Sequence, residues 1–153
     1  MTVEERLKEL GYTLPQAAQP VGNYVGAVQT GNLVYVSGHG PRRPDGSSMS
    51  GKVGGELTRE QGYEAARLCM LGCLGSLKRA IGDLDRVTRI VKLLGMVNCT
   101  EDFGQQPAVI NGGSDLLVEL FGDRGRHARS AVGMQGLPSN TPVEIEMIVE
   151  VAP

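Results

Sequence analysis

The chain has 153 residues, with 15 basic and 17 acidic side chains and a formal net charge of −2. This length is typical of one domain, so we expect a single domain over residues 1–153 that needs no disulfide or metal support. No basic run alternates with aromatic residues, which disfavours a nucleic-acid surface. The apolar runs are shorter than the roughly 18 residues of a membrane span, and no signal-peptide core is visible, so we expect a cytoplasmic protein.

Three cysteines, Cys69, Cys73 and Cys99, make an odd count that fits a reducing compartment. Cys69 and Cys73 lie four residues apart on one face of a predicted helix, where they either pack in the core or serve a metal or redox role. Neither His39 nor His127 has ligand-type spacing from this pair. We therefore favour core packing and expect no metal site.

The first twenty residues are predicted to form a short helix and a connector. Thr2 and Glu5 make a capping box, and Gly11 ends the helix. Residues 12–24 have two prolines and no period. Residues 24–41 then contain two apolar runs about a Gly31-Asn32 turn signal, which predicts a hairpin, and residues 42–55 form a loop by composition.

Two long helices and one strand are predicted next. Thr58 and Gln61 cap the first helix, which runs to Gly82. Residues 86–98 form an apolar strand, and a second helix spans about 106–121. Two adjacent glycines weaken that helix by about 1 kcal/mol each relative to alanine, so packing must stabilise the turn that contains them.

The predicted fold is an α+β sandwich in which two long helices cover one face of a mixed sheet. The central strand is apolar on both faces, so its second face also needs a cover, and a second copy of the chain is the simplest one. Its two faces are Val91, Leu93, Gly95 and Val97 on one side and Ile90, Leu94 and Met96 on the other.

Residues 127–151 are predicted to form another hairpin, with Arg129 just inside its first strand. Ala131 and Gly133 share the face of Arg129 and leave space beside the guanidinium. One interpretation is an anion pocket. The other is an edge-strand arginine that discourages aggregation.

The last strand has its glutamates on one face. With a turn centred on Ser139-Asn140, Arg129 lies nearly opposite Glu150, and Glu144 is displaced by roughly 20 Å along the strand. Arg129 and Glu144 therefore share a site only if neighbouring subunits bring them together.

Several catalytic signatures are absent from the sequence: G-x-S-x-G, the Walker loop, H-E-x-x-H, and G-x-G-x-x-G between a strand and a helix. Conventional nucleophilic or metal-dependent hydrolysis is disfavoured.

Two segments, GNYVGAVQTGNLVYVSGHGP and HARSAVGMQGLPSNTPVEIEMIVEV, resemble the reactive intermediate deaminase (RidA, or YjgF) family. The resemblance extends from about residue 21 to the end of the chain. It implies a chorismate-mutase-like fold assembled as a homotrimer, with clefts between subunits. That assembly agrees with the uncovered sheet face expected from the apolar pattern.

The resemblance also implies site residues. Arg129 matches the arginine that binds the substrate carboxylate, and Glu144 matches a late glutamate that orients or deprotonates water, or accepts an intersubunit hydrogen bond. The other matches are Tyr24, Ser37, Gly38 and, across a length difference of one residue, Asn111. The sequence departs from the family at Ala131, where many members have cysteine, and at His39, where glutamine is frequent. His127 is expected to be a surface or interface residue rather than a general base.

Family members hydrolyse 2-imino acids, or their enamine tautomers, to 2-keto acids and ammonia. We therefore expect a hydrolase acting on C=N bonds, with no cofactor and a small imino or keto acid as ligand. One alternative is a non-catalytic trimer that binds small carboxylates or regulates a partner. A third hypothesis, a ribonuclease or translation inhibitor, fits the acidic chain less well.

Overall fold

A computed structural model describes residues 1–17 and 22–153; residues 18–21 of the predicted connector lie outside this part. In chain order, its helices and strands are α1 (Val3–Glu9), β1 (Ala27–Thr30), β2 (Leu33–His39), α2 (Arg59–Ile81), β3 (Val87–Asn98), α3 (Gln106–Phe121), β4 (Ala128–Met134) and β5 (Val143–Val151). Within the described residues, no helix is both long and apolar enough to cross a membrane.

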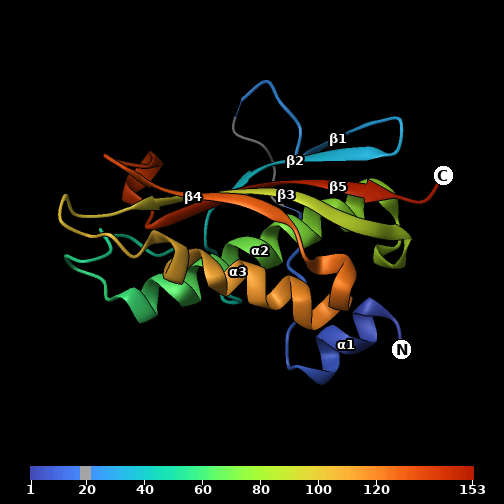
Figure 1. Cartoon of the computed structure of the whole chain (residues 1–153), viewed down its shortest axis with the longest axis horizontal. Coiled ribbons are helices and arrows are strands. Elements are labelled where there is room, and N and C mark those ends of the chain that lie inside the picture. The colour runs from blue at the N-terminus through green and yellow to red at the C-terminus, as the bar shows by residue number, and fades with distance from the viewer. Residues whose placement is uncertain (18–21) are drawn as a thin grey trace.

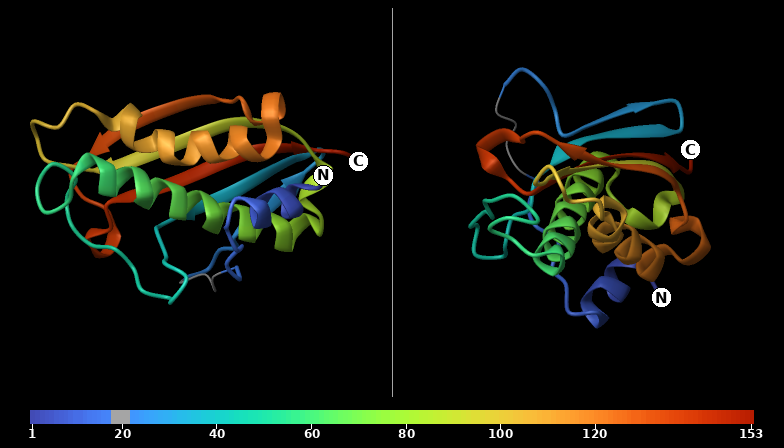
Figure 2. Two further views of the ribbon diagram at one scale, coloured as in Figure 1. Left: turned by 90° about the horizontal axis from the view of Figure 1, so that it is seen from below. Right: turned by 60° about the vertical axis from the view of Figure 1, so that its left-hand side comes forward.

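The strands form one mixed sheet in the order β1-β2-β5-β3-β4. β3 and β4 are parallel, and the other neighbours are antiparallel. α2 and α3 lie side by side across one face of this sheet, and the short helix α1 lies outside them (Figures 1 and 2). The predicted α+β sandwich, with its two long helices on one face, is confirmed.

The helix ends follow local sequence signals. Capping boxes begin α1 at Thr2 and α2 at Thr58, as predicted. α2 ends at Gly82, whose φ of 87° lies in the left-handed region that favours glycine. The predicted turn at Gly31-Asn32 joins β1 to β2, with Thr30 paired to Leu33.

The predicted hairpin over residues 127–151 is wrong. β4 pairs with β3 in parallel, and β5 lies on the other side of β3, so the turn at residues 138–140 joins two strands that are not neighbours. At the end of β3, the Asn98 side chain donates hydrogen bonds to Asn140 Oδ1 and to the carbonyl of Thr141. These bonds fix the connection that passes from β4 to β5.

This change of partner also alters the predicted register. Arg129 pairs with Leu93 of β3, whereas Glu150 pairs with Leu33 and Arg89. Arg129 is therefore not opposite Glu150. The backbone groups along both edges of a central strand need hydrogen-bond partners. For β3 these partners are β4 on one edge and β5 on the other.

The predicted faces of β3 are correct at its end and wrong at its start. A register shift between Ile90 and Lys92 turns Ile90 toward the helices, where it is fully buried, and leaves Val91 36% exposed. Beyond this irregularity, strict alternation buries Leu93 under the helices and turns Leu94 to the opposite face.

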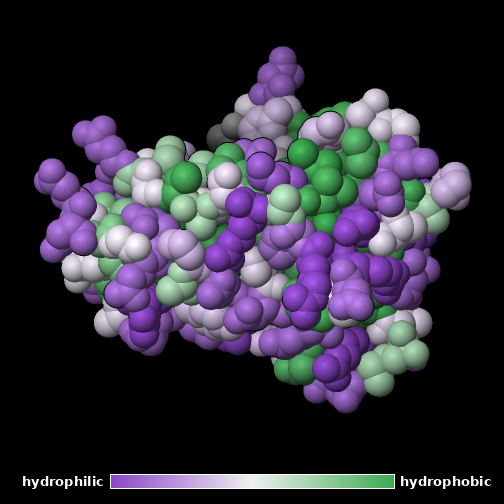
Figure 3. All heavy atoms as spheres, viewed as in Figure 1, coloured by the Kyte–Doolittle hydropathy of each residue, from purple (hydrophilic) through white to green (hydrophobic). Residues whose placement is uncertain are grey.

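The face of the sheet away from the helices carries an apolar patch. Val28 and Tyr35 are cross-strand partners and are 53% and 45% exposed. In Figure 3, hydrophobic side chains gather in the upper right of the molecule, over β1 and β2. Val132 of β4 is also exposed on this face, which is here called the open face. Exposed apolar area of this kind is typical of an interaction surface.

Candidate functional site

Arg129 lies on the edge strand β4, on the side of the sheet that the helices cover. One terminal nitrogen, Nη1, donates to Ser114 Oγ at 3.0 Å, and the other, Nη2, donates to the carbonyl of Pro107 at 3.2 Å. Both acceptors belong to α3. The guanidinium is therefore held in one orientation while the side chain stays partly exposed.

Asn111 belongs to the helix that Arg129 contacts. It follows Pro107 by four residues and precedes Ser114 by three, so the three residues share one face of α3. α3 begins at Gln106, as predicted, and Asn111 is in its second turn. Arg129 contacts this same face of α3 through Pro107 and Ser114.

A hydrogen-bond chain behind Arg129 defines the tautomer of His127. Its Nδ1 lies 2.6 Å from the carbonyl of Gly125, which only accepts, so Nδ1 carries the proton. Nε2 then accepts from the hydroxyl of Ser114 at 2.8 Å, which leaves the oxygen of Ser114 to accept from Arg129. Burial lowers the pKa of His127, the bond to Gly125 opposes this, and the charge of Arg129 lowers it further. His127 is thus a neutral support for Arg129.

Glu144 and Gly38 meet on neighbouring strands β5 and β2. A Cβ at residue 38 would lie 2.4 Å from Glu144 Oε2, so only glycine allows the carboxylate this close to the β2 backbone. Glu144 is partly buried. Burial raises the pKa of its carboxyl, and the negative charge of Glu146 raises it further.

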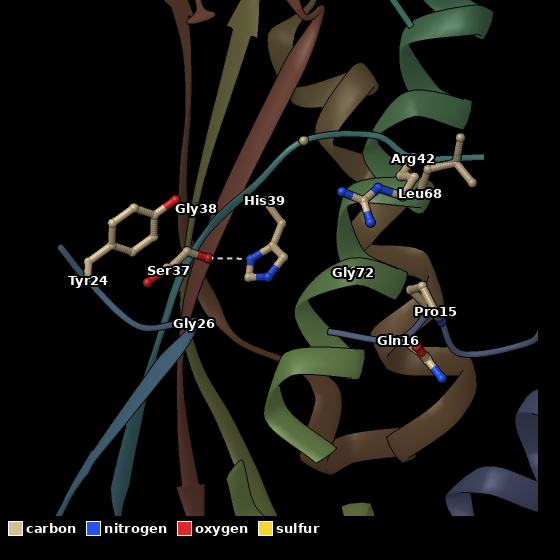
Figure 4. Close-up of a pocket in the computed structure, with 11 residues that line it drawn as sticks. Pro15, Gln16, Tyr24, Gly26, Ser37, Gly38, His39, Arg42, Leu68 and Gly72 are labelled. Carbon is tan, nitrogen blue, oxygen red and sulfur yellow. Dashed lines mark hydrogen bonds between the residues drawn. The ribbon is translucent and has the colours of Figure 1, made fainter. Parts of the chain in front are cut away.

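Ser37 fixes the segment that carries Tyr24. Its hydroxyl donates to the carbonyl of Val25 at 2.6 Å, and its backbone N–H donates to Gly26. Tyr24 stays 54% exposed. The predicted residues Tyr24, Ser37 and Gly38 line one cavity between the end of β2 and α2 (Figure 4).

The same cavity is also lined by His39 and Arg42. From the sequence, His39 had no role beyond a departure from the family pattern, and Arg42 was not singled out. His39 Nδ1 lies 2.6 Å from the carbonyl of Ser37, and its Nε2 lies 2.7 Å from Ser76 Oγ, so both ring nitrogens are bonded. No sequence signal separates Arg42 from its neighbour Arg43, because both stand in a loop.

The predicted residues therefore form two half-sites in one chain. Arg129 of β4 and Asn111 of α3 lie at the β4 edge. Ser37 and Gly38 of β2 and Glu144 of β5 lie on neighbouring strands, and Tyr24, in the segment before β1, lies beside the end of β2 (Figure 4). The partner of Arg129 on β3, Leu93, is buried under the helices, whereas Glu144 is on the open face. β3 and the thickness of the sheet separate the two half-sites within one copy.

The cysteines play a packing role. Cys69 and Cys73 are fully buried, and their thiols donate to the carbonyls of Val143 and Ile145. Burial raises the pKa of both thiols, which makes them poor nucleophiles. Among the residues that the structure describes, no group of His, Cys, Asp or Glu has the arrangement of a metal site.

Ala131 follows Arg129 on the same face of β4 and packs against the core. The position where many RidA members carry cysteine thus holds a methyl group beside the guanidinium, which cannot supply a thiol.

Comparison with known proteins gives consistent matches along the whole chain. Residues 4–151 match the family model described as "YjgF/chorismate_mutase-like, putative endoribonuclease". Protein TCP17 of Trypanosoma cruzi is 45% identical over 97% of this chain and 93% of its own length. The 2-iminobutanoate/2-iminopropanoate deaminase of Dermatophagoides farinae is 32% identical over 88% of this chain and 91% of its own length.

A solved structure is also similar to this chain along most of its length. The crystal structure of the protein Atu1372 from Agrobacterium tumefaciens, of unknown function, superposes with a TM-score of 0.91 at 45% identity. The match covers 98% of this chain and 92% of that one.

Proposed function

Because the chain belongs to the YjgF/RidA-like family, we propose that it hydrolyses reactive 2-imino acids to 2-keto acids and ammonia. The observation that carries this proposal is the fixed orientation of the Arg129 guanidinium, which donates hydrogen bonds to Ser114 and Pro107. A guanidinium binds a carboxylate through two parallel hydrogen bonds, a geometry that lysine does not match.

The active unit in this proposal is a homotrimer. The open face of each copy is covered by its neighbours, and the β4 edge of one copy faces Glu144 and Gly38 of the next. The exposed Val28, Tyr35 and Val132 support such an interface. The separation of the two half-sites in one chain supports it further, because neither half contains both a carboxylate-binding group and a base.

The reaction needs no strong nucleophile. The carbon of a protonated imine is electrophilic, so a water molecule attacks it while the Glu144 carboxylate accepts a proton from that water. The C–O bond forms as the electron pair of the C=N bond moves to nitrogen. The Glu144 carboxyl then gives this proton to the nitrogen of the carbinolamine. As the C–N bond breaks, the hydroxyl proton passes back to the Glu144 carboxylate, the C=O bond of the 2-keto acid forms, and the ammonia that leaves takes up this proton as ammonium.

The size of the proposed effect follows from the two bonds of Arg129. Charge-assisted hydrogen bonds are worth about 1.5 to 3 kcal/mol each, so the pair contributes about 3 to 6 kcal/mol to carboxylate binding. This is sufficient for a reaction that already proceeds in water, where positioning of the substrate and the attacking water supplies the acceleration.

We expect the purified protein to accelerate imine loss when an amino-acid oxidase supplies the imine. The measurement is ammonia release, or competition with semicarbazide trapping, for several amino acids. No acceleration with any of them contradicts the proposal. Stabilisation by 2-keto acids without turnover would instead indicate a carboxylate-binding protein.

A control with single-stranded RNA tests the nuclease activity named in the family description. The carboxylates of Glu144, Glu146 and Glu150 on the open face disfavour phosphate binding there.

The acid side of the pH profile should depend on Glu146. Glu144 must be ionised to accept a proton, and its pKa is raised, so kcat/KM should rise with pH through a value above the ordinary 4.5. Glu146→Gln removes one cause of the raised pKa and should move this limb to lower pH. Glu150 hydrogen-bonds Thr88 at the other end of β5, so Glu150→Gln is the control. An unmoved limb in Glu146→Gln, or equal shifts in both variants, would remove Glu144 as the base.

Ser114→Ala should loosen Arg129 without removing it. The variant loses the oxygen that accepts a hydrogen bond from the Arg129 guanidinium. It also loses the hydroxyl group that donates a hydrogen bond to Nε2 of His127. We expect a loss of about 1 kcal/mol in substrate binding, seen as a KM about fivefold higher with a smaller change in kcat. Steady-state kinetics measure this split. An unchanged KM would show that Arg129 keeps its orientation without Ser114.

A further inference from the structure

We propose that a cleft at the end of β4 binds the side chain of the imino acid, so that the chain prefers substrates with a long, neutral, apolar side chain. Such imines are what an oxidase releases from amino acids such as norleucine or methionine. This inference rests on the proposed function, in which Arg129 of the same copy binds the α-carboxylate.

The cleft lies where the ends of β3 and β4 meet the start of α3, and its volume is about 630 Å³. This volume is in the range of small-molecule sites. Its lining includes Cys99 and Phe103 from the segment between β3 and α3, Gln106 of α3, and Gly133 and Met134 of β4. Sulfur atoms and an aromatic ring therefore contribute to its walls.

The cleft adjoins the Arg129 guanidinium through the first turn of α3. A Cβ at residue 133 would lie 2.9 Å from Gln106 Nε2, so the side chain of Gln106 lies over Gly133. Nη2 of Arg129 donates to the carbonyl of Pro107, the next residue of the helix. The side chain of Arg129 is therefore directed along β4 toward Gly133, past Ala131 on the same face. A carboxylate bound to this guanidinium lies beside the cleft.

Gly133 determines how the wall beside Arg129 is built. Because glycine has no Cβ, Gln106 Nε2 and Cys99 Sγ can lie close to the β4 backbone, and a Cβ at residue 133 would come within 3.1 Å of that sulfur. The Gln106 amide is held there by bonds to the carbonyl of Phe103 at 2.9 Å and to Cys99 Sγ at 3.5 Å. A larger residue at 133 must displace this amide or project into the cleft itself, and both changes reduce the space for a ligand.

The charges of the cleft favour a neutral ligand group. Among the described residues that line it, the charged ones are Lys52 and Glu101, which have opposite signs. Lys52 Nζ already donates to Asn98 Oδ1 at 2.7 Å and to the carbonyl of Gln135 at 2.5 Å, and Glu101 is exposed. A second carboxylate on the ligand would be attracted by one charge and repelled by the other. An apolar side chain instead gains from leaving water beside Phe103.

The test compares the imines that an amino-acid oxidase makes from norleucine and from alanine, whose side chains differ by three CH₂ groups. Each fully buried CH₂ contributes a factor of about four, so kcat/KM should be at least about tenfold higher for the norleucine imine. Gly133→Val should lower this value about tenfold for the norleucine imine and at most about threefold for the alanine imine, and Gly133→Ala should act in the same way but less. Gly136→Val is the matched control and should change neither, because a Cβ at residue 136 would meet no atom within 4 Å. Equal losses for both imines would overturn the proposal.

A binding measurement separates this proposal from the proposed function, because calorimetric titration with 2-keto acids requires no turnover. 2-Oxohexanoate should bind the wild-type and Gly136→Val proteins at least about tenfold more tightly than pyruvate does, and Gly133→Val should reduce this difference. 2-Oxoglutarate should bind no more tightly than pyruvate; tighter binding would show that Lys52 selects an acidic ligand and would overturn the proposal. If no imine is hydrolysed but the preference for 2-oxohexanoate is present, the proposed function fails and the apolar cleft stands. If pyruvate and 2-oxohexanoate bind alike, the role of the cleft is wrong even where imines are hydrolysed.

Discussion

Arg129→Ala is expected to lower kcat/KM for imino acids by about 30-fold to 4,000-fold, which corresponds to about 2 to 5 kcal/mol. The physical reason is the loss of both N–H···O bonds to the substrate carboxylate, together with the loss of the orientation that Ser114 and Pro107 give the guanidinium. Arg129→Lys keeps the charge but not the two parallel bonds, so its activity should lie between those of the wild type and Arg129→Ala. Steady-state kinetics with oxidase-generated imines measure both variants.

Arg126 provides the matched control for this experiment. It is three residues away and exposed, and its only ion pair in the described part is with Asp123 at 3.5 Å. Arg126→Ala should leave kcat/KM within about twofold, because exposed pairs contribute little. If Arg129→Ala retained full activity while folded, carboxylate binding by Arg129 would be excluded.

Gly112→Ala is expected to destabilise the protein by about 2 to 3 kcal/mol. Helix propensity alone predicts the opposite sign, since alanine is favoured over glycine in a helix by about 1 kcal/mol. However, a Cβ at residue 112 would lie 2.0 Å from the carbonyl oxygen of Tyr63, a backbone atom of α2 that cannot move without shifting the helix. Overpacking of this kind costs about 1 to 3 kcal/mol or more and should outweigh the propensity gain.

Thermal unfolding measures this effect, and a loss of 2 to 3 kcal/mol should lower Tm by about 4 to 12 °C for a chain of this length. Gly104→Ala is the control, because its Cβ would meet no atom within 4 Å. A Gly112→Ala protein as stable as the wild type would show that α2 and α3 do not approach as closely as the structure indicates.

The helices were predictable because their signals are local. The capping boxes at Thr2 and Thr58 and the terminal glycines Gly82 and Gly122 lie within a few residues of the ends that they define. Gly112 was noted from the sequence only as a weak point, and the structure shows its reason: the contact with Tyr63 joins residues about fifty positions apart, and no local pattern reports it.

Strand pairing was less predictable, because it too depends on contacts between residues far apart in the sequence. The turn at Ser139 and Asn140 exists, with positive φ at both residues, but a turn does not specify whether the two strands it joins are neighbours. The insertion of β3 between β4 and β5 depends on long-range hydrogen bonds such as those of Asn98. The irregularity at Ile90 likewise follows from pairing and not from composition.

The candidate site was predicted in part. The resemblance identified Arg129 and Glu144, and the structure places each against partners that orient it or shift its pKa. The supporting Ser114 and the cavity cation Arg42 were not found from the sequence. A serine on a helix and an arginine in a loop have no distinguishing pattern until the fold shows what they touch.

The assembly of the site from two copies is tested most directly by mixing two inactive variants, Arg129→Ala and Glu144→Gln. Each site needs Arg129 from one copy and Glu144 from the next, so random mixing in equal amounts should restore about one quarter of the wild-type activity. The double variant mixed with itself provides the baseline. Recovery near one quarter is the predicted result, whereas no recovery from well-folded, demonstrably mixed assemblies would contradict a site shared between copies.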